Sequence, residues 1–195
     1  MTCLFDPVSM TWTRGPDMNY RRWYPTVITL ADGRALILGG SDVTTVDYID
    51  TPEVYDPVTN TITQLNNAKL AIPSYCFAYQ NTDGRVIVTG SDEAKMPTYA
   101  LNVATQTWST VDATVLDAGS GVMYRPGQFM KAGSSYLSAP ADNGGSTPSK
   151  ATTYVLDTTA GAPVWETRFG YASNTTLGAR NKVWEPRFGF NYTFD

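Results

Sequence analysis

Histidine is absent from the 195 residues of this chain, and its absence excludes several kinds of site. A Ser-His-Asp or Cys-His arrangement needs an imidazole base, so the sequence alone supplies neither. Zinc sites with the usual Cys and His spacing are excluded for the same reason. The sequence also contains no Gly-x-x-x-x-Gly-Lys-[Ser/Thr] segment and therefore offers no phosphate loop of that type.

Cysteine, long apolar runs and clustered positive charge are scarce as well. The two cysteines, Cys3 and Cys76, are too few for a disulfide framework, and we interpret both as small buried apolar groups. No run approaches the ~18 apolar residues of a membrane span, and Met1–Asp6 lacks the basic and apolar regions of a signal peptide. The net charge is -4 and the 14 lysines and arginines are dispersed, which argues against nucleic acid and anionic membranes as partners.

The sequence favours strands over helices. No segment shows a sustained apolar period of about 3.6 residues, and 16 glycines and 12 prolines interrupt the chain. The apolar runs are short, as in Ala35-Leu36-Ile37-Leu38 and Val86-Ile87-Val88. Nearly every residue in them is apolar, as expected for strands that are covered on both faces. We therefore predict an all-β chain with a sizeable core.

A repeat with a period of about 50 residues organises these strands. Asp32-Gly33-Arg34 returns 51 positions later as Asp83-Gly84-Arg85, and Gly39 returns at the same offset as Gly90. Phe5-Asp6-Pro7 also reappears as Tyr55-Asp56-Pro57, and Trp12 has counterparts in Trp108 and Trp165. Periods of this length are typical of blade-type repeats, here with four strands in each unit.

The repeated residues predict how the strands connect and pack. Asp-Gly between apolar runs signals a two-residue hairpin turn, because glycine readily adopts the positive φ that such a turn needs. Gly39-Gly40 is expected to let the chain pass closely under a neighbour, since no side chain intrudes. The tryptophans and tyrosines have the bulk to fill the wedge between neighbouring blades.

The expected units make up about three and a half four-stranded blades. They are the end of a truncated blade at 1–17, blades at 18–66 and 67–113, a divergent blade at 114–170, and a partial blade or irregular tail at 171–195. Propellers usually close with about four to eight blades, so this number leaves an open arc with exposed edges. We expect a fragment of a larger propeller, and the alternative is that copies associate to close the ring. Residues 164–171 nearly recur as 183–190, an offset that does not match the repeat.

Four motifs carry a resemblance to a known family. They are Gly15-Pro16-Asp17-Met18, Arg22-Trp23-Tyr24, Asp32-Gly33-Arg34 and Gly39-Gly40. Together they resemble the kelch-type β-propeller of the galactose oxidase and glyoxal oxidase group of copper radical oxidases, and Arg-Trp-Tyr is more similar to the glyoxal oxidase side. The resemblance covers residues 1–113 well, 114–165 loosely and the tail poorly.

The resemblance implies a single copper near the propeller axis, held by two tyrosines and two histidines. One tyrosine, joined to a cysteine by a thioether, is oxidised to a radical and takes a hydrogen from an alcohol or an aldehyde hydrate, while dioxygen is reduced to hydrogen peroxide. Tyr24 matches this tyrosine, eight residues before Asp32. By resemblance Tyr24 is therefore the candidate catalytic residue and metal ligand, and the complete protein is expected to be secreted or extracellular.

The sequence departs from the family at the other site positions. Without histidine the chain supplies neither imidazole ligand, and oxygen donors alone hold copper poorly. The family's cross-linking cysteine belongs to the preceding blade, whereas Cys76 follows Tyr75, the counterpart of Tyr24. A shift of one residue in a strand turns a side chain to the other face, so Cys76 is a poor substitute. Asp42 stands in the place of a stacking tryptophan, and Asn81 stands near the place of a substrate-binding arginine.

Structural roles are the alternative for the same residues. An aromatic residue at the start of an innermost strand often packs near the axis, and the repetition of Tyr24 as Tyr75 fits this role. Arg21 and Arg22 are candidates to position an anionic ligand, and the alternative is an ion pair at the surface or between blades. Asp32 and its repeat are interpreted as turn residues.

Two functions from different classes stay open. The first is an incomplete part of a copper radical oxidase that acts on carbohydrate alcohols or small aldehydes, with this chain alone expected to be inactive and to hold no copper. The second is a non-catalytic kelch-repeat module that binds a protein or a glycan. Expected partners are the remaining blades or a second copy. An upstream cysteine one blade before Tyr24, and a downstream Tyr-His pair with a further histidine, would indicate the oxidase.

Overall fold

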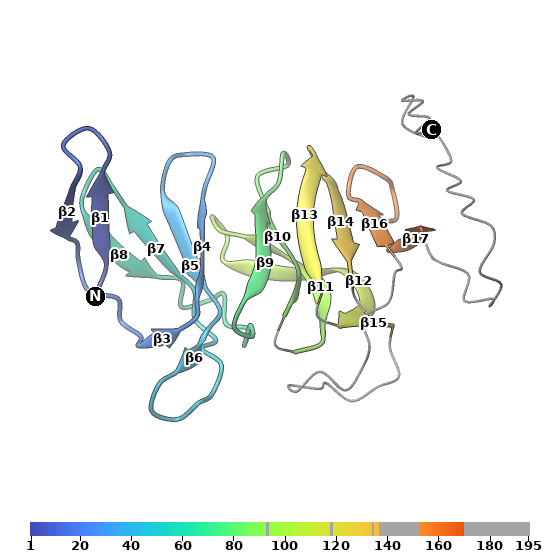
Figure 1. Cartoon of the computed structure of the whole chain (residues 1–195), viewed down its shortest axis with the longest axis horizontal. Coiled ribbons are helices and arrows are strands. Elements are labelled where there is room, and N and C mark those ends of the chain that lie inside the picture. Colours follow the sequence, from blue (N-terminus) through green and yellow to red (C-terminus); the bar gives the residue numbers. More distant parts are fainter. Residues whose placement is uncertain (93, 118, 134, 137–152, 170–195) are drawn as a thin grey trace, which may run out of the picture.

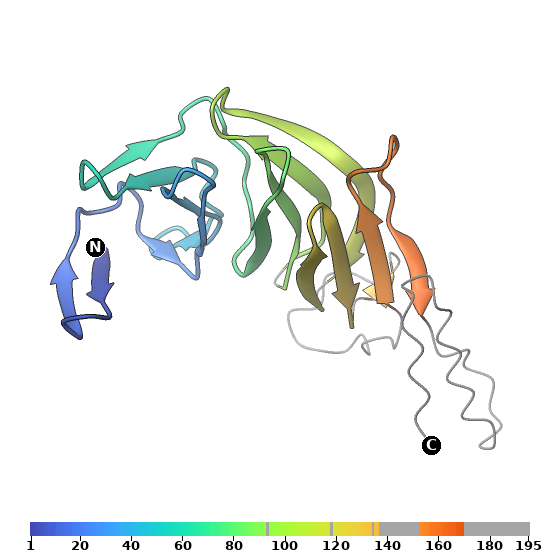
Figure 2. The ribbon, with the colours of Figure 1, turned by 90° about the horizontal axis from the view of Figure 1, so that it is seen from above.

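The chain folds into antiparallel β-sheets that follow one another in a row (Figure 1), and the row curves into an arc (Figure 2). This computed structural model describes residues 1–92, 94–117, 119–133, 135–136 and 153–169. Strands and turns alternate in these ranges and no helix occurs there, which confirms the all-β prediction. In the same ranges no helix is long and apolar enough to cross a membrane. The unit expected at 171–195, with its near-copy of 164–171, lies outside the described residues.

A two-stranded hairpin opens the chain. Strand β1 (Cys3–Asp6) pairs with β2 (Thr11–Arg14), and the ring of Phe5 contacts that of Trp12 at 5.0 Å between centroids. Trp12 is 68% exposed, so among the described residues it does not fill a space between sheets. Cys3 is exposed as well, which corrects its interpretation as a buried apolar group.

The first four-stranded sheet is an antiparallel meander. Its strands are, in spatial order, β4 (Thr26–Thr29), β5 (Ala35–Leu38), β7 (Glu53–Asp56) and β8 (Thr61–Gln64). A short pair, β3 (Arg22–Trp23) with β6 (Ser41–Asp42), lies at the end of this sheet opposite the turn between β4 and β5 (Figure 1).

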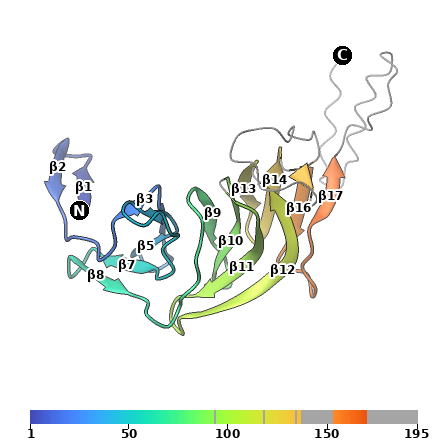
Figure 3. The same ribbon diagram turned by 90° about the horizontal axis from the view of Figure 1, so that it is seen from below.

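Two further sheets continue the arc. The second contains β9 (Cys76–Gln80), β10 (Val86–Ser91), β11 (Met96–Asn102) and β12 (Thr107–Asp117), with β15 (Ser135–Tyr136) added beside β12. The third contains β13 (Ser120–Arg125), β14 (Gln128–Ala132), β16 (Thr153–Asp157) and β17 (Glu166–Phe169). The first strands β4, β9 and β13 lie next to one another, and β12 runs along the outer side of the arc (Figures 2 and 3).

Two apolar clusters fill the spaces between successive sheets. Leu36, Leu38, Val86 and Val88 belong to the cluster between the first and second sheets, and Ile87 belongs to the cluster that includes Phe129 and Leu156 of the third sheet. Neighbouring residues of β10 thus point into different cores because side chains alternate along a strand. All three residues Val86–Val88 are fully buried, which confirms the expectation of strands covered on both faces.

Two tryptophans fill the predicted positions between sheets. Trp108 packs against the first cluster and donates its indole N–H to the carbonyl of Ala68 at 2.9 Å. Trp165 packs against the second cluster and donates to Thr98 Oγ1 at 2.8 Å, which links the third sheet to the second. Buried indoles usually satisfy their N–H in this way.

The Asp-Gly-Arg turns are hairpins, with one correction to their length. Leu30 N donates to Arg34 O at 2.7 Å and Gly33 N donates to Leu30 O at 3.0 Å, so the loop contains three residues rather than the predicted two. Such a loop is a type I turn followed by a left-handed residue, and Gly33 has φ +86°. The carboxylate of Asp32 accepts from Arg34 N at 3.1 Å, which confirms the aspartate as a turn residue.

Gly39 lies where the first sheet meets the second. Its φ is +66°, and a Cβ added there would lie 2.8 Å from Pro73 O and 3.3 Å from Cys76 Sγ. The expected close passage under a neighbour is therefore confirmed. The number of blades, the kelch type and the unit boundaries stay predictions.

Alanine substitutions at Gly39 and Gly33 distinguish two costs: the clash of a Cβ with Pro73, which only Gly39 would have, and the strain of a positive φ, which both would have. Both positions have positive φ, but a Cβ at Gly33 would meet nothing within 4 Å. We expect Gly33→Ala to cost about 1–2 kcal/mol from the left-handed backbone, and Gly39→Ala to cost about 1–3 kcal/mol more from overpacking. Urea denaturation of both variants measures the difference, and equal losses would contradict the contact with Pro73.

Candidate functional site

Tyr24 lies between the short strand β3 and the first strand of the first sheet. Its backbone is left-handed, with φ +51°, and its side chain is 46% exposed. The Trp23 ring meets the Tyr24 ring edge-on, with centroids 4.5 Å apart and planes at 64°. A non-glycine residue with positive φ is uncommon and strained, so the surrounding structure must hold it in place.

Tyr75 occupies the same place before the first strand of the second sheet. It also has a left-handed backbone, with φ +55°, and it donates its backbone N–H to Tyr24 O at 3.3 Å. The two rings are stacked, with centroids 4.4 Å apart and planes at 29°. Gly119, with φ +79°, precedes the first strand of the third sheet. The repeat therefore includes a left-handed residue before each of these three first strands.

Arg22 forms a buried ion pair within the first unit. Its Nε lies 3.1 Å from Glu53 Oε2, and both side chains are 0% exposed. Its Nη1 donates to Gly39 O at 2.9 Å, and its Nη2 donates to Thr51 O. Burial lowers the pKa of Arg22, and the carboxylate of Glu53 opposes this shift. Arg22 is thus buried and paired with a residue of the neighbouring first four-stranded sheet, so its ion pair is not at the surface.

Glu53 also fixes the chain that leads to Arg22. Its Oε1 accepts from the backbone N–H of Asn19 at 2.7 Å and from Asn19 Nδ2 at 2.9 Å. Sequence reasoning missed this residue. One signal could have indicated it: Glu53 begins a strand and stands next to the apolar Val54. A charged side chain is almost never fully buried unless it is paired, so a glutamate in such a strand calls for a cationic partner.

Arg21 and Asp42 lie near strand β3, Arg21 directly before it and Asp42 opposite Arg22, and neither contacts the Tyr24 ring in the interactions described. Arg21 is exposed, and its carbonyl accepts from Val43 N at 3.4 Å. Asp42 accepts from Thr44 N at 2.7 Å, and backbone hydrogen bonds from Thr44 and Thr45 lower its pKa. Asp42 therefore caps the turn after β6.

Cys76 is turned into the core. The residue is buried, belongs to the first apolar cluster and lies under Gly39, whereas the neighbouring Tyr75 ring stacks on Tyr24. Burial raises the pKa of the Cys76 thiol from 9.0 to about 11. Because the folded chain holds this proton more tightly than the unfolded chain, folding loses stability as the pH rises from 9.0 toward about 11.

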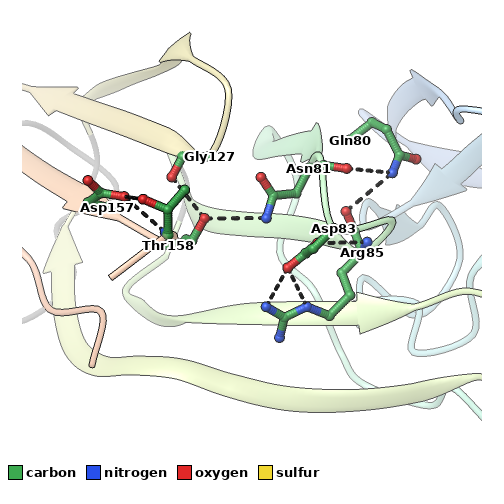
Figure 4. A network of polar contacts seen from close by, with 8 residues as sticks. Gln80, Asn81, Asp83, Arg85, Gly127, Asp157 and Thr158 are labelled. Atoms are coloured by element: carbon green, nitrogen blue, oxygen red, sulfur yellow. Dashed lines mark hydrogen bonds and ion pairs between the residues drawn. The ribbon is translucent and has the colours of Figure 1, made fainter. Parts of the chain in front are cut away.

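Asn81 lies at the other end of the second sheet from Tyr75. Residues Cys76–Gln80 separate the two, a strand of roughly 17 Å at the usual rise per residue. Asn81 is buried and donates to Thr158 Oγ1 at 3.3 Å, and Thr158 donates to Gly127 O at 2.8 Å (Figure 4). This polar network joins the second and third sheets, so the position near Asn81 is not part of the surface around Tyr24.

The described side chains around Tyr24 do not make up the donor set that copper prefers. Copper sites in proteins favour nitrogen and sulfur ligands, yet the sequence has no histidine and Cys76 is buried as a protonated thiol. In the described ranges no group of three or more histidine, cysteine, aspartate or glutamate side chains could hold a metal ion. A phenol oxygen from Tyr24 is the candidate donor that these residues offer.

Comparison with known proteins finds a similar fold and a short stretch of similar sequence. No protein-family model matches it. Among solved structures it is similar to a fungal alcohol oxidase of the AA5 family in complex with copper, with a TM-score of 0.61 and 20% identity over 88% of this chain and 38% of the other. Its arc of antiparallel sheets is consistent with the β-propeller-like fold of that oxidase.

A closer sequence relationship covers a shorter segment. Over 69 residues the chain is 42% identical to two galactose oxidase sequences from Gibberella zeae, a match that covers 35% of this chain and 10% of each relative. Over part of its length the chain is therefore galactose oxidase-like, as the motifs around Tyr24 predicted. It spans only a minor part of the relatives that it matches.

Thiol labelling tests the placement of the two cysteines. We expect Ellman's reagent at mildly alkaline pH to modify the exposed Cys3 rapidly and the buried Cys76 about a hundredfold or more slowly, because the latter reacts only after local opening. Cys3→Ser should remove the fast phase and Cys76→Ser the slow one. Rapid labelling of Cys76 in the Cys3→Ser variant would contradict its burial.

Proposed function

We propose that this chain is one part of a galactose oxidase-like copper oxidase, with Tyr24 at the position of the family's cross-linked tyrosine. The observation that carries the proposal is the 42% identity with galactose oxidase over 69 residues, in a chain whose fold is shared with a copper-bound alcohol oxidase. The position of Tyr24 supports it, because the ring is exposed at the end of an innermost strand.

The other copper ligands would come from protein outside this sequence. The chain has no histidine and covers 38% of the alcohol oxidase structure, so a complete protein has room for further blades and ligands. The chain on its own is proposed to be inactive. The complete protein is proposed to oxidise carbohydrate alcohols or small aldehydes and to reduce dioxygen to hydrogen peroxide.

The same proposal includes three more specific points. We propose that the repeat is of the kelch type, that the complete protein is more similar to glyoxal oxidase, and that it is secreted. All three depend on the resemblance of Arg22-Trp23-Tyr24 and its neighbouring motifs. Further blades would cover the face of the first sheet that points away from the second sheet, where Val27 of β4 is exposed. Association with a second copy is the other way to cover it.

A non-catalytic binding module is the second candidate. The observation that favours it is the pairing of Tyr24 with Tyr75, because a stacked pair of tyrosines at repeated positions is also a packing feature of the axis. Asp42 and the buried Arg22 add no substrate-binding group beside the pair. The module would present this end of the sheets to a protein or a glycan.

Copper binding and peroxide production test the first proposal. We expect the chain of 195 residues to show no tight stoichiometric copper binding and no peroxide with galactose or methylglyoxal, because the imidazole ligands are absent. We expect the full reading frame to encode a cysteine one blade before Tyr24 and histidines downstream. In that full-length protein, Tyr24→Phe should reduce peroxide production to background.

The matched control is Tyr75→Phe in the same full-length protein. It alters the repeated tyrosine but keeps a ring that can stack on Tyr24, so most of the activity should remain. A reading frame without the cysteine and histidines would favour the binding module. Peroxide production by the chain alone would overturn the requirement for histidine.

A further inference from the structure

Tyr24 and Tyr75 form an exposed pair of tyrosines from successive repeats. Their rings are stacked at 4.4 Å between centroids, and Tyr24 is 46% and Tyr75 is 42% exposed. Rings at this separation have carbon atoms near van der Waals contact, about 3.5–4.0 Å. A diffusible oxidant can therefore reach both phenols while the two rings remain neighbours.

The backbone holds the two tyrosines together before any reaction. Tyr75 N donates to Tyr24 O at 3.3 Å, and Thr26 Oγ1 donates to Cys76 O at 2.7 Å, so the residues after each tyrosine are also joined. Both tyrosines keep a left-handed backbone at these positions. Such positioning replaces a bimolecular encounter by an intramolecular one and raises the effective concentration of one ring near the other.

We propose that Tyr24 and Tyr75 are a site of dityrosine formation under one-electron oxidation. Each phenol would lose one electron and its proton to the oxidant, giving two phenoxyl radicals. The radicals would couple through ring carbons next to the hydroxyl-bearing carbons, and the hydrogens on these carbons would move to the oxygens. With a haem peroxidase carrying the electrons, one hydrogen peroxide is reduced to two water molecules for each carbon–carbon bond formed.

Two other tyrosines pack against rings of a different residue type. Tyr79 packs against Phe129 at 5.6 Å, and Tyr99 packs against Trp108 at 6.3 Å. Tyr24 and Tyr75, by contrast, have each other's phenol ring as a stacked neighbour. Coupling within one chain should therefore favour Tyr24 and Tyr75 over Tyr79 and Tyr99.

The cross-link would join the first sheet to the second. Tyr24 precedes β4 and Tyr75 precedes β9, and these two strands lie side by side (Figure 2). A covalent bond there would connect the sheets at the end opposite the Asp-Gly-Arg turns (Figure 1). The reaction needs no metal bound by this chain, so the proposal goes beyond the proposed oxidase and does not depend on it.

Peroxidase treatment followed by peptide mapping tests the proposal. The chain is treated at low concentration with a haem peroxidase and limiting hydrogen peroxide, and it is then digested with trypsin. Cleavage after arginine and lysine places Tyr24 in peptide 23–34 and Tyr75 in peptide 70–85. We expect these two peptides to be joined with the loss of two hydrogen atoms, to show dityrosine fluorescence, and to form with a yield per chain that is independent of protein concentration.

Conservative variants assign the bond. Tyr24→Phe and Tyr75→Phe should each abolish the joined peptide, whereas Tyr79→Phe is the matched control because Tyr79 lies in peptide 70–85. Cys76→Ala is the second control, since a thioether from Tyr24 to Cys76 would join the same peptides with the same mass. Near-identical circular dichroism spectra establish that the variants fold.

Three results would overturn the proposal. They are a joined peptide that survives in Tyr75→Phe, a joined peptide that is lost in Cys76→Ala, and coupling that appears only between chains and falls on dilution. Retention of the link in both control variants and its loss in both test variants would support the assignment. Absence of dityrosine in the folded wild-type chain, with the peroxidase active on free tyrosine, would also overturn it.

Discussion

The buried ion pair between Arg22 and Glu53 is the interaction on which the surroundings of Tyr24 depend. Two fully buried charges are expensive to desolvate, and they are tolerated only when hydrogen bonds satisfy them. Here the guanidinium also donates to the carbonyls of Gly39 and Thr51, and the carboxylate also accepts from Asn19. One pair therefore ties the segment before Tyr24 to two other parts of the first sheet. The left-handed backbone of Tyr24 follows directly after this anchored segment.

The two ends of the sheets have different chemistry. At the end with the Asp-Gly-Arg turns, Asn81, Thr158 and Gly127 form a polar network between the second and third sheets (Figure 4). At the other end, Tyr24 and Tyr75 are exposed and their rings stack, while Arg22, two residues before Tyr24, is buried in its ion pair with Glu53. The proposed function assigns any oxidase chemistry to this second end, and the sequence contributes no histidine to it.

Local signals predicted much of the fold and less of the site. The repeat of Asp-Gly-Arg located the hairpins, the run Val86–Val88 identified a strand buried on both faces, and Gly39 marked a close passage. Each of these signals lies within a short stretch of sequence, although the contact of Gly39 with Pro73 joins distant residues. The partnership of Arg22 with Glu53 joins positions 31 residues apart, and no spacing rule indicates it. The stack of Tyr24 on Tyr75 and the exposure of Trp12 depend on how whole sheets lie against one another, so the repeat suggested the equivalence of the tyrosines but not their contact.

The central claim is that Arg22 has a structural role: its guanidinium stabilises the fold by pairing with Glu53 and does not bind an anionic ligand. A double-mutant cycle with Arg22→Met and Glu53→Leu, followed by urea denaturation, tests it most directly. We expect Arg22→Met and Glu53→Leu each to lower the free energy of unfolding by about 3–5 kcal/mol, because each leaves the other charge buried without its partner. The double variant should be more stable than the sum of the two losses predicts, with a coupling of up to about 3 kcal/mol. Small and additive losses would contradict the claim and would leave Arg22 available to bind a ligand.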